Sequence, residues 1–138
     1  MNTAFYGKLY LATVPVFFAI DLLWLGIIAK DLYQKNLSHL LSPTVNWPAA
    51  FLFYLLYIAG IILFAVKPAL EAQSLARAAV WGGLFGFFTY MTYDLTNLAT
   101  LRDWPIKIVV VDIAWGTLLC TLVASGSYLI GRWLGGPS

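Results

Sequence analysis

The sequence predicts an all-α fold, an integral membrane antiparallel four-helix bundle with short loops. The first observation is composition, because 62% of the 138 residues are hydrophobic and only 10% are charged. A water-soluble domain usually carries about 25% charged residues, so this chain lacks the polar surface of a soluble protein. The second observation is four apolar stretches, each long enough to cross a hydrocarbon core of about 30 Å as a helix. We expect residues 1–138 to form a single transmembrane domain.

The four expected spans are bounded by residues that suit helix ends and membrane surfaces. The spans cover about residues 9–29, 48–66, 78–99 and 106–130. Pro105 directly precedes the fourth span, where proline is tolerated because the first turn of a helix needs no N–H donor. Trp47 and Trp104 fall at one membrane face, and Trp81 and Trp133 fall at the other. Tryptophan is enriched at both interfaces, so these positions support the register of the spans.

The connection between the first two spans, residues 30–41, has a pattern of its own. Its apolar residues share one helical face through a spacing of i, i+4, i+7 and i+8. They are Tyr33, Leu37, Leu40 and Leu41. We expect a short helix here that lies in the membrane interface. The alternative is that the first helix simply continues into water.

Four spans place both termini on one side of the membrane. We call the opposite side, which carries the connections at residues 30–47 and 100–105, the loop face. Basic residues are divided evenly, with Lys8, Lys67, Arg77 and Arg132 on the terminal side and Lys30, Lys35, Arg102 and Lys107 on the loop face. The positive-inside rule therefore gives no orientation. A cleaved signal peptide is the alternative for the first span, but that span is too long and carries Asp21.

Three aspartates, Asp21, Asp94 and Asp112, lie inside apolar spans. A charged aspartate at the bilayer centre costs roughly 2.5–3.5 kcal/mol, so such residues turn inward, toward each other or toward water. At about 1.5 Å per helical residue, Asp21 lies about 12 Å from the loop face and the other two lie about 9 Å from it. Tyr54 of the second span reaches a similar depth. Every span therefore supplies a polar side chain to one layer.

The third span is polar at one end and rich in glycine at the other. At its polar end, Tyr93, Asn97 and Thr100 form a stripe on one helical face through the spacing i, i+4 and i+7, and Tyr90 and Asp94 flank this stripe. Gly82 and Gly86 continue the same stripe toward the opposite membrane face, and small residues four apart let a neighbouring helix approach closely. We expect this helix to be the most enclosed of the four.

The first and last spans share an aspartate–tryptophan pair. Asp21 precedes Trp24 by three residues, and Asp112 precedes Trp115 by the same spacing. Residues three apart share a helical face, so each pair points the same way. One interpretation of the shared pattern is a trace of internal duplication. The alternative is that each tryptophan fills the core and its N–H satisfies a carboxylate or carbonyl.

We interpret the polar layer and its aromatic neighbours as a candidate ligand-binding site. The candidates are Asp21, Trp24, Tyr54, Tyr90, Tyr93, Asp94, Asn97, Asp112 and Trp115. We expect Asp94 to matter most, because it lies on the most enclosed helix. The catalytic residues stay unknown, and we assign no metal ligand and no cofactor, since the spans hold no histidine and the common nucleotide and phosphate motifs are absent. The net charge is only +2 and the basic residues are scattered, so the sequence has no basic patch of the kind that binds nucleic acid.

Three functions remain open at this point. The first is a protein that binds a small molecule or a membrane lipid at this site. Such a protein could also transport its ligand, coupled to a proton or a cation, if two copies of the chain formed a homodimer with a translocation path. The second is a membrane-embedded enzyme that acts on a lipid or isoprenoid-like substrate through aspartate acid–base chemistry. The third is a structural or assembly protein whose aspartates are neutral and hydrogen-bonded.

Several short stretches together carry a family resemblance. They are Asp21-x-x-Trp24-Leu25-Gly26, Phe53-Tyr54-Leu55-Leu56-Tyr57, the run from Tyr93 to Leu101, Trp104-Pro105 and Asp112-x-x-Trp115-Gly116. The chain resembles a bacterial family of predicted four-span membrane proteins of unknown function, the domain of unknown function 2177 family. The resemblance covers essentially the whole chain and implies this fold and a location in the bacterial inner membrane. It implies no established activity, so no catalytic residue is carried over from it.

The four-span topology has a direct test. A reporter fused to the N-terminus and the same reporter fused to the C-terminus should score on the same side of the membrane, because an even number of crossings returns the chain to its starting side. A protease-accessibility or alkaline phosphatase assay reads the side. Scores on opposite sides would contradict the four-span prediction.

Overall fold

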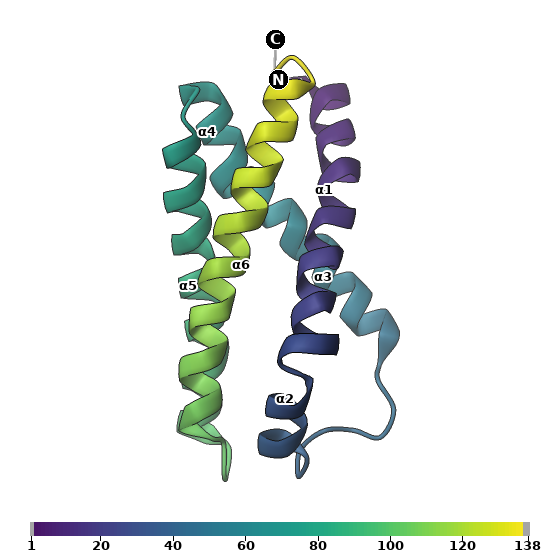
Figure 1. The fold of residues 1–138 in the computed structure, drawn as a ribbon, viewed down its shortest axis with the longest axis vertical. Coiled ribbons are helices and arrows are strands. Elements are labelled where there is room, and N and C mark those ends of the chain that lie inside the picture. Colours follow the sequence, from purple (N-terminus) through teal and green to yellow (C-terminus); the bar gives the residue numbers. More distant parts are fainter. Residues whose placement is uncertain (1, 137–138) are drawn as a thin grey trace.

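The computed structural model describes residues 2–136, and all regular secondary structure in this range is helical. Its elements are α1 (Thr3–Leu23), the π-helical turn η1 (Trp24–Ile28), α2 (Lys30–Leu37), α3 (Trp47–Ile61), the π-helical turn η2 (Ile62–Val66), α4 (Lys67–Ala72), α5 (Leu75–Thr100) and α6 (Ile106–Trp133). The chain descends through α1, rises through α3 to α4, descends through α5 and rises through α6 (Figure 1). The predicted all-α bundle is confirmed.

Two ends of the bundle are named from the course of the chain. α1 begins and α6 ends at the same end of the molecule, which we call the terminal end (Figure 1). The opposite end carries α2 and the turn between α5 and α6, and we call it the loop end (Figure 1). How these ends face the two sides of a membrane stays a prediction.

Three helical rods within residues 2–136 have the length and composition of membrane spans: Thr3–Ile28, Trp47–Ala72 and Ile106–Trp133. They correspond to the first, second and fourth expected spans, although the first rod ends one residue before the expected end of the first span. The third expected span lies in α5, which is 26 residues long but is not among these three apolar rods. Arg77, Asp94 and several threonine, tyrosine and glycine residues lower the hydropathy of α5. Its crossing of the membrane therefore stays a prediction.

Short polar side chains mark where three of the helices begin. The side chains of Asn2, Asn46 and Ser74 accept hydrogen bonds from backbone N–H groups three residues further on, at 3.0, 3.2 and 3.1 Å. Such N-caps satisfy donors that have no partner inside the helix. Between α4 and α5, Gln73 adopts a left-handed conformation with φ 52°, which ends α4 and turns the chain sharply.

The helix expected at residues 30–41 is present but shorter, because α2 ends at Leu37. Leu37 is buried against Trp104 and Ile108, so α2 packs on the beginning of α6. Leu40 and Leu41 were expected on the same face, but they lie beyond the end of the helix and are exposed. The place of α2 in the membrane interface stays a prediction.

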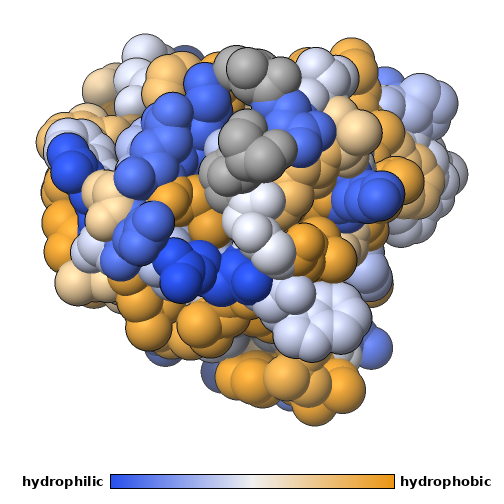
Figure 2. All heavy atoms as spheres, turned by 90° about the horizontal axis from the view of Figure 1, so that it is seen from above, coloured by the Kyte–Doolittle hydropathy of each residue, from blue (hydrophilic) through white to orange (hydrophobic). Residues whose placement is uncertain are grey.

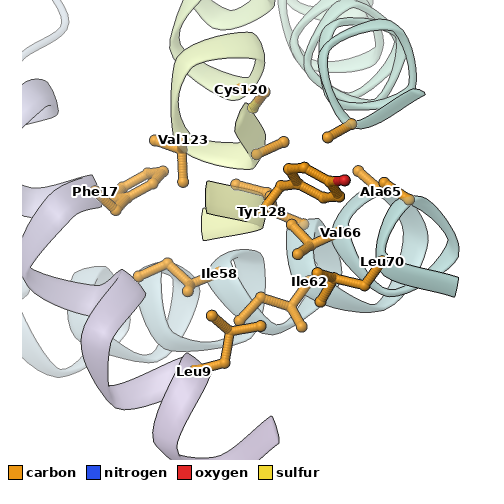
Figure 3. Packing of buried hydrophobic residues seen from close by; sticks show 14 of the residues in the cluster. Leu9, Phe17, Ile58, Ile62, Ala65, Val66, Leu70, Cys120, Val123 and Tyr128 are labelled. Atoms are coloured by element: carbon orange, nitrogen blue, oxygen red, sulfur yellow. The ribbon is translucent and has the colours of Figure 1, made fainter. Parts of the chain in front are cut away.

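A hydrophobic cluster fills the terminal half of the bundle, as the positions of its residues along α1 and α6 show. Figure 3 shows its packing from close by. It includes Leu9, Phe17, Ile58, Ile62, Val66, Leu119, Val123 and Tyr128. Inside this apolar region the hydroxyls of Thr13 and Ser127 are completely buried and lie 2.8 Å apart, which joins α1 to α6. The pairing matters because a buried hydroxyl without a partner would destabilise the fold.

The outside of the bundle is apolar along the helices. Large exposed side chains include Leu11, Ile27, Leu56, Phe64, Val80 and Val110. Viewed from the terminal end, hydrophilic residues gather over the end of the molecule, and hydrophobic residues surround them (Figure 2). An apolar belt of this extent is unusual in a soluble monomer and suits contact with lipid.

The closest helix contact joins α5 to α6, which agrees with the close approach expected from the glycine stripe. The expectation that α5 is the most enclosed helix was wrong, because most of its residues are exposed and α6 buries more of its own. A Cβ atom added at Gly82 would lie 2.5 Å from the Ala124 Cβ, and one added at Gly86 would overlap the Gly116 carbonyl oxygen. Neither position tolerates a side chain without a shift of the helices. The two backbones therefore touch along this line, which is the packing mode that small residues allow in membranes.

Gly86→Ala should destabilise the protein, whereas Gly126→Ala should not. A methyl group at Gly86 would press on the α6 backbone, and overpacking of this kind costs about 1–3 kcal/mol, more than the up to about 1 kcal/mol gained in helix propensity. At Gly126 the nearest atom to an added Cβ is 4.0 Å away, so only the propensity gain applies. Thermal unfolding of both variants in detergent tests this. Equal unfolding midpoints would contradict the close contact.

Candidate functional site

A pocket of about 450 Å³ lies between the helices in the half of the bundle nearer the loop end. It is lined by Asp21, Leu25, Tyr33, Leu37, Phe53, Tyr54, Tyr57, Thr89, Tyr90, Tyr93, Trp104, Ile108, Asp112 and Trp115. All four helical rods, α2 and the turn before α6 contribute to this lining. The volume falls within the range of about 300–1,000 Å³ that is typical of small-molecule sites.

The lining of the pocket is aromatic and acidic. Eight of its fourteen residues are tyrosine, tryptophan or phenylalanine, so most of the wall is formed by flat rings. Asp21 and Asp112 are the two acidic residues of the lining, and no described residue in it is lysine, arginine or histidine. The pocket therefore combines an apolar surface with negative or hydrogen-bonding groups and offers no positive charge to a ligand.

Asp21 is the last buried residue of a stripe that follows α1. Every fourth residue from Phe5 to Asp21 is buried, so this face of α1 runs from the hydrophobic cluster to the pocket. The Trp115 indole N–H of α6 donates to Asp21 Oδ1 over 3.4 Å, which is a long hydrogen bond. The Tyr54 hydroxyl of α3 also interacts with this carboxyl. Asp21 thus lies where three helices meet.

Asp112 is held from the other side of the pocket by α2. The Tyr33 hydroxyl donates to Asp112 Oδ1 over 2.6 Å, and the Trp24 indole N–H donates to the Tyr33 oxygen over 3.2 Å. Burial, and then the neighbouring Asp112 carboxyl, raise the pKa of the Tyr33 phenol. The phenol therefore keeps its proton and remains a donor at neutral pH.

The two aspartate–tryptophan pairs cross over between α1 and α6. Trp24 and Trp115 stack with ring centroids 4.4 Å apart and planes 7° apart. Trp115 of α6 donates to Asp21 of α1, while Trp24 is connected through Tyr33 to Asp112 of α6. The spacing in the sequence placed each pair on one helical face. The structure adds that each aspartate is linked to the tryptophan of the other helix.

A second polar group closes the pocket toward the terminal end. The Tyr57 hydroxyl of α3 lies 2.7 Å from Thr89 Oγ1 of α5 and 3.1 Å from the Cys120 sulfur of α6. Beside it, the ring of Tyr90 lies directly over Gly116, where a side chain of any size would overlap it. These contacts tie α3, α5 and α6 together above the pocket.

Asp94 lies beside the pocket and does not line it. Its side chain is completely buried, and neither carboxyl oxygen makes a hydrogen bond with the described residues. Its polar neighbours are Asp112 and the indole of Trp104, whose N–H is also buried without a partner. Buried polar groups are nearly always paired, so this corner is the least satisfied part of the structure.

The mouth of the pocket faces sideways between α3 and α5. Phe53 on α3 and Tyr93 on α5 line the pocket and are also 50% and 57% exposed, and Leu25 of η1 is the third exposed residue of the lining, so these side chains form its rim. α3 runs away from α5 toward the loop end (Figure 1). At the loop end itself, Leu37 of α2 packs on Trp104 and closes that direction. If the helices cross a membrane, this mouth opens toward lipid.

Six of the nine candidate residues line the pocket: Asp21, Tyr54, Tyr90, Tyr93, Asp112 and Trp115. Trp24 and Asp94 lie outside the lining: Trp24 stacks on the lining residue Trp115, and Asp94 neighbours the lining residue Asp112. Asn97 lies outside the lining and is partly exposed. Tyr93 was expected inside the bundle, but its side chain is largely exposed at the rim. The binding role of the candidates stays a prediction.

Sequence reasoning missed several residues of the pocket, above all Tyr33 and Trp104. The shared face of Tyr33 and Leu37 was visible, but it was assigned to the membrane interface. Trp104 was assigned to an aromatic belt, whereas it is 8% exposed and lies edge-on to Tyr93. Within residues 2–136, no group of three or more histidine, cysteine, aspartate or glutamate residues is arranged to hold a metal ion.

Comparisons with known proteins give one match. The family described as "Predicted membrane protein (DUF2177)" matches residues 6–129. No curated protein and no solved structure matches the chain.

Tyr33→Phe should weaken the contact of α2 with the bundle. The change removes the donor to Asp112 and leaves the Trp24 N–H without its acceptor, and a buried polar group left without a partner costs about 1–3 kcal/mol. Tyr128→Phe is the matched control, because its hydroxyl makes no hydrogen bond with the described residues. Thermal unfolding in detergent should show a lower midpoint for Tyr33→Phe alone. A similar midpoint for both variants would exclude a stabilising role for the Tyr33 bond.

Proposed function

The chain belongs to the DUF2177 family of predicted membrane proteins, and on that premise we propose that it binds a small amphipathic molecule within the membrane. The observation that carries the proposal is the pocket of about 450 Å³, with its aromatic wall and its two carboxyl groups. Ligand sites are commonly apolar cavities with a few placed polar groups that fix orientation. The polar groups here are fixed by bonds from Tyr33 and Trp115.

The sideways mouth supports a ligand that arrives from the lipid phase. The rim residues Phe53 and Tyr93 are exposed and aromatic, and α2 covers the direction of the loop end. A molecule with an apolar tail can enter through such a mouth while its polar head moves toward Asp21 and Asp112. The tail then stays among lipid chains and needs no cavity of its own.

The terminal half of the bundle is packed, which favours ligand binding by a single chain over passage of a ligand through that chain. The hydrophobic cluster that includes Ile58, Leu119 and Val123 fills the space between the pocket and the terminal end. A single chain therefore holds its ligand in a dead-ended pocket. Transport would require either movement of these helices or a second copy of the chain.

The unpaired polar atoms near Asp94 argue against a purely structural polar layer. Such a layer would be fully hydrogen-bonded, because each unsatisfied buried group costs about 1–3 kcal/mol. Both Asp94 oxygens and the Trp104 N–H lack partners among the described residues. A buried group without a protein partner needs an explanation, and a bound ligand, an ordered water or a movement of the helices each supplies one.

Thr89→Leu should impair binding, and Thr92→Leu should not. Both threonines lie on α5 and donate to the carbonyl four residues earlier, at 2.8 and 2.6 Å, so their local roles match. Only Thr89 lines the pocket, where leucine would occupy free volume and remove the bond to Tyr57. Calorimetric titration of protein in phosphatidylcholine nanodiscs with ten-carbon amphiphiles of neutral, cationic and anionic heads measures binding.

The proposal expects at least one of these amphiphiles to bind saturably, with one site per chain. Affinity should fall at least about tenfold in Thr89→Leu, which corresponds to 1.4 kcal/mol. Empty nanodiscs provide the reference for partition into lipid. The absence of saturable binding to the wild-type protein, or equal binding by the two threonine variants, would overturn the proposed function.

A further inference from the structure

The charge of the pocket selects among possible ligands. Asp21 meets only neutral donors, the Trp115 N–H and the Tyr54 hydroxyl. Asp112 meets the Tyr33 hydroxyl and the carboxyl of Asp94. Neither carboxyl forms an ion pair with a described residue. Buried acids are usually paired with a positive group, and this part of the chain supplies none.

The aromatic wall suits the same kind of ligand. A cation is attracted to the face of an aromatic ring, and tryptophan attracts it most strongly. Trp24 covers one face of Trp115, so the pocket meets the opposite face or edge of that ring. Tyr54 and Tyr57 approach the pocket from α3, and Tyr90 approaches it from α5. The carboxyl groups are therefore surrounded by rings that attract positive charge.

We infer that the ligand is an organic cation, an amine or quaternary ammonium head attached to an apolar tail. This inference rests on the proposed function and names the class of molecule that the site takes. The head lies between Asp21 and Asp112, against the rings of Trp115 and the tyrosines. The tail leaves through the mouth between Phe53 and Tyr93. An anionic head would find two carboxyl groups and no basic residue in the lining, so the pocket offers it no group of opposite charge.

A neutral ligand is the competing class, and three probes distinguish the two. Decyltrimethylammonium, decanol and decyl phosphate share a ten-carbon tail and differ in the charge of the head. Each is titrated into the wild-type protein in phosphatidylcholine nanodiscs, with the two charged probes below their micellar concentrations, decanol below its solubility limit and empty nanodiscs as reference. We expect decyltrimethylammonium to bind at least about tenfold more tightly than decanol. Decyl phosphate should show no saturable binding.

The outcomes separate this inference from the proposed function. Decanol that binds saturably and as tightly as the ammonium probe overturns the cation and leaves the pocket function standing. Tightest binding by decyl phosphate also overturns the cation. No saturable binding by any probe overturns both. None of these outcomes depends on a variant, so a misfolded mutant cannot obscure them.

Variants then test whether the two carboxyl groups attract the cation. Asp112→Asn and Asp21→Asn each remove an ionisable carboxyl group and keep an oxygen that accepts from Tyr33 or Trp115. Each change should weaken decyltrimethylammonium roughly tenfold or more and leave decanol unchanged. Asp31→Asn is the control, because Asp31 is exposed on α2 and outside the pocket. Equal ammonium affinity in all three variants would overturn the role of the pocket acids.

Discussion

The close contact between α5 and α6 is the constraint on which the rest of the structure depends. With no side chain at Gly86, the α5 backbone reaches the backbone of α6. The two helices run in opposite directions, so each turn of one meets a turn of the other in a fixed register. The register that brings Gly86 to α6 also places Tyr90 over Gly116. One turn further along, it brings Asp94 beside Asp112. The least satisfied polar groups of the protein are thus a consequence of its tightest apolar packing.

The pocket follows from how the other helices attach to this pair. α1 is fixed along α6 by the hydroxyl pair of Thr13 and Ser127 and by the stacked indoles of Trp24 and Trp115. α3 is fixed near its C-terminal half, where Tyr57 reaches α5 and α6, and it leans away from them toward the loop end (Figure 1). A bundle that is closed at one end and splayed at the other encloses a space. Aromatic side chains are large enough to line that space without filling it.

Much of this arrangement was predictable, because a membrane restricts the chain so strongly. Helices are the only open-ended structures that satisfy their own backbone in lipid, and aspartates inside them must turn inward. The glycine stripe was found for the same reason. The position of Tyr93 was not predicted correctly, because the face of α5 that packs on α6 carries Gly86, Tyr90 and Asp94. Tyr93 is one residue away, which is about 100° of rotation around a helix and enough to put it at the rim. The entry of Tyr33 into the pocket depends on how the chain leaves α1, and hydrophobic periodicity does not describe that.

The π-helical turn η1 determines the direction in which the chain leaves α1 and enters α2. A π-helical turn holds one more residue than an α-helical turn, so it acts like an insertion within the helix. Each residue advances the helical face by about 100°, and the insertion therefore changes which side chains of the following segment face the bundle. Here it is followed by Ala29, whose N–H bonds to the Trp24 carbonyl at 2.7 Å before α2 starts. A relative of this chain that lacked one residue between Trp24 and Ala29 would keep its composition and its hydropathy profile. It would close this turn as an ordinary α-helix and keep its tyrosine on the same side of α2, whereas the full number of residues wound as an α-helix would turn the tyrosine by about 100° away from the pocket.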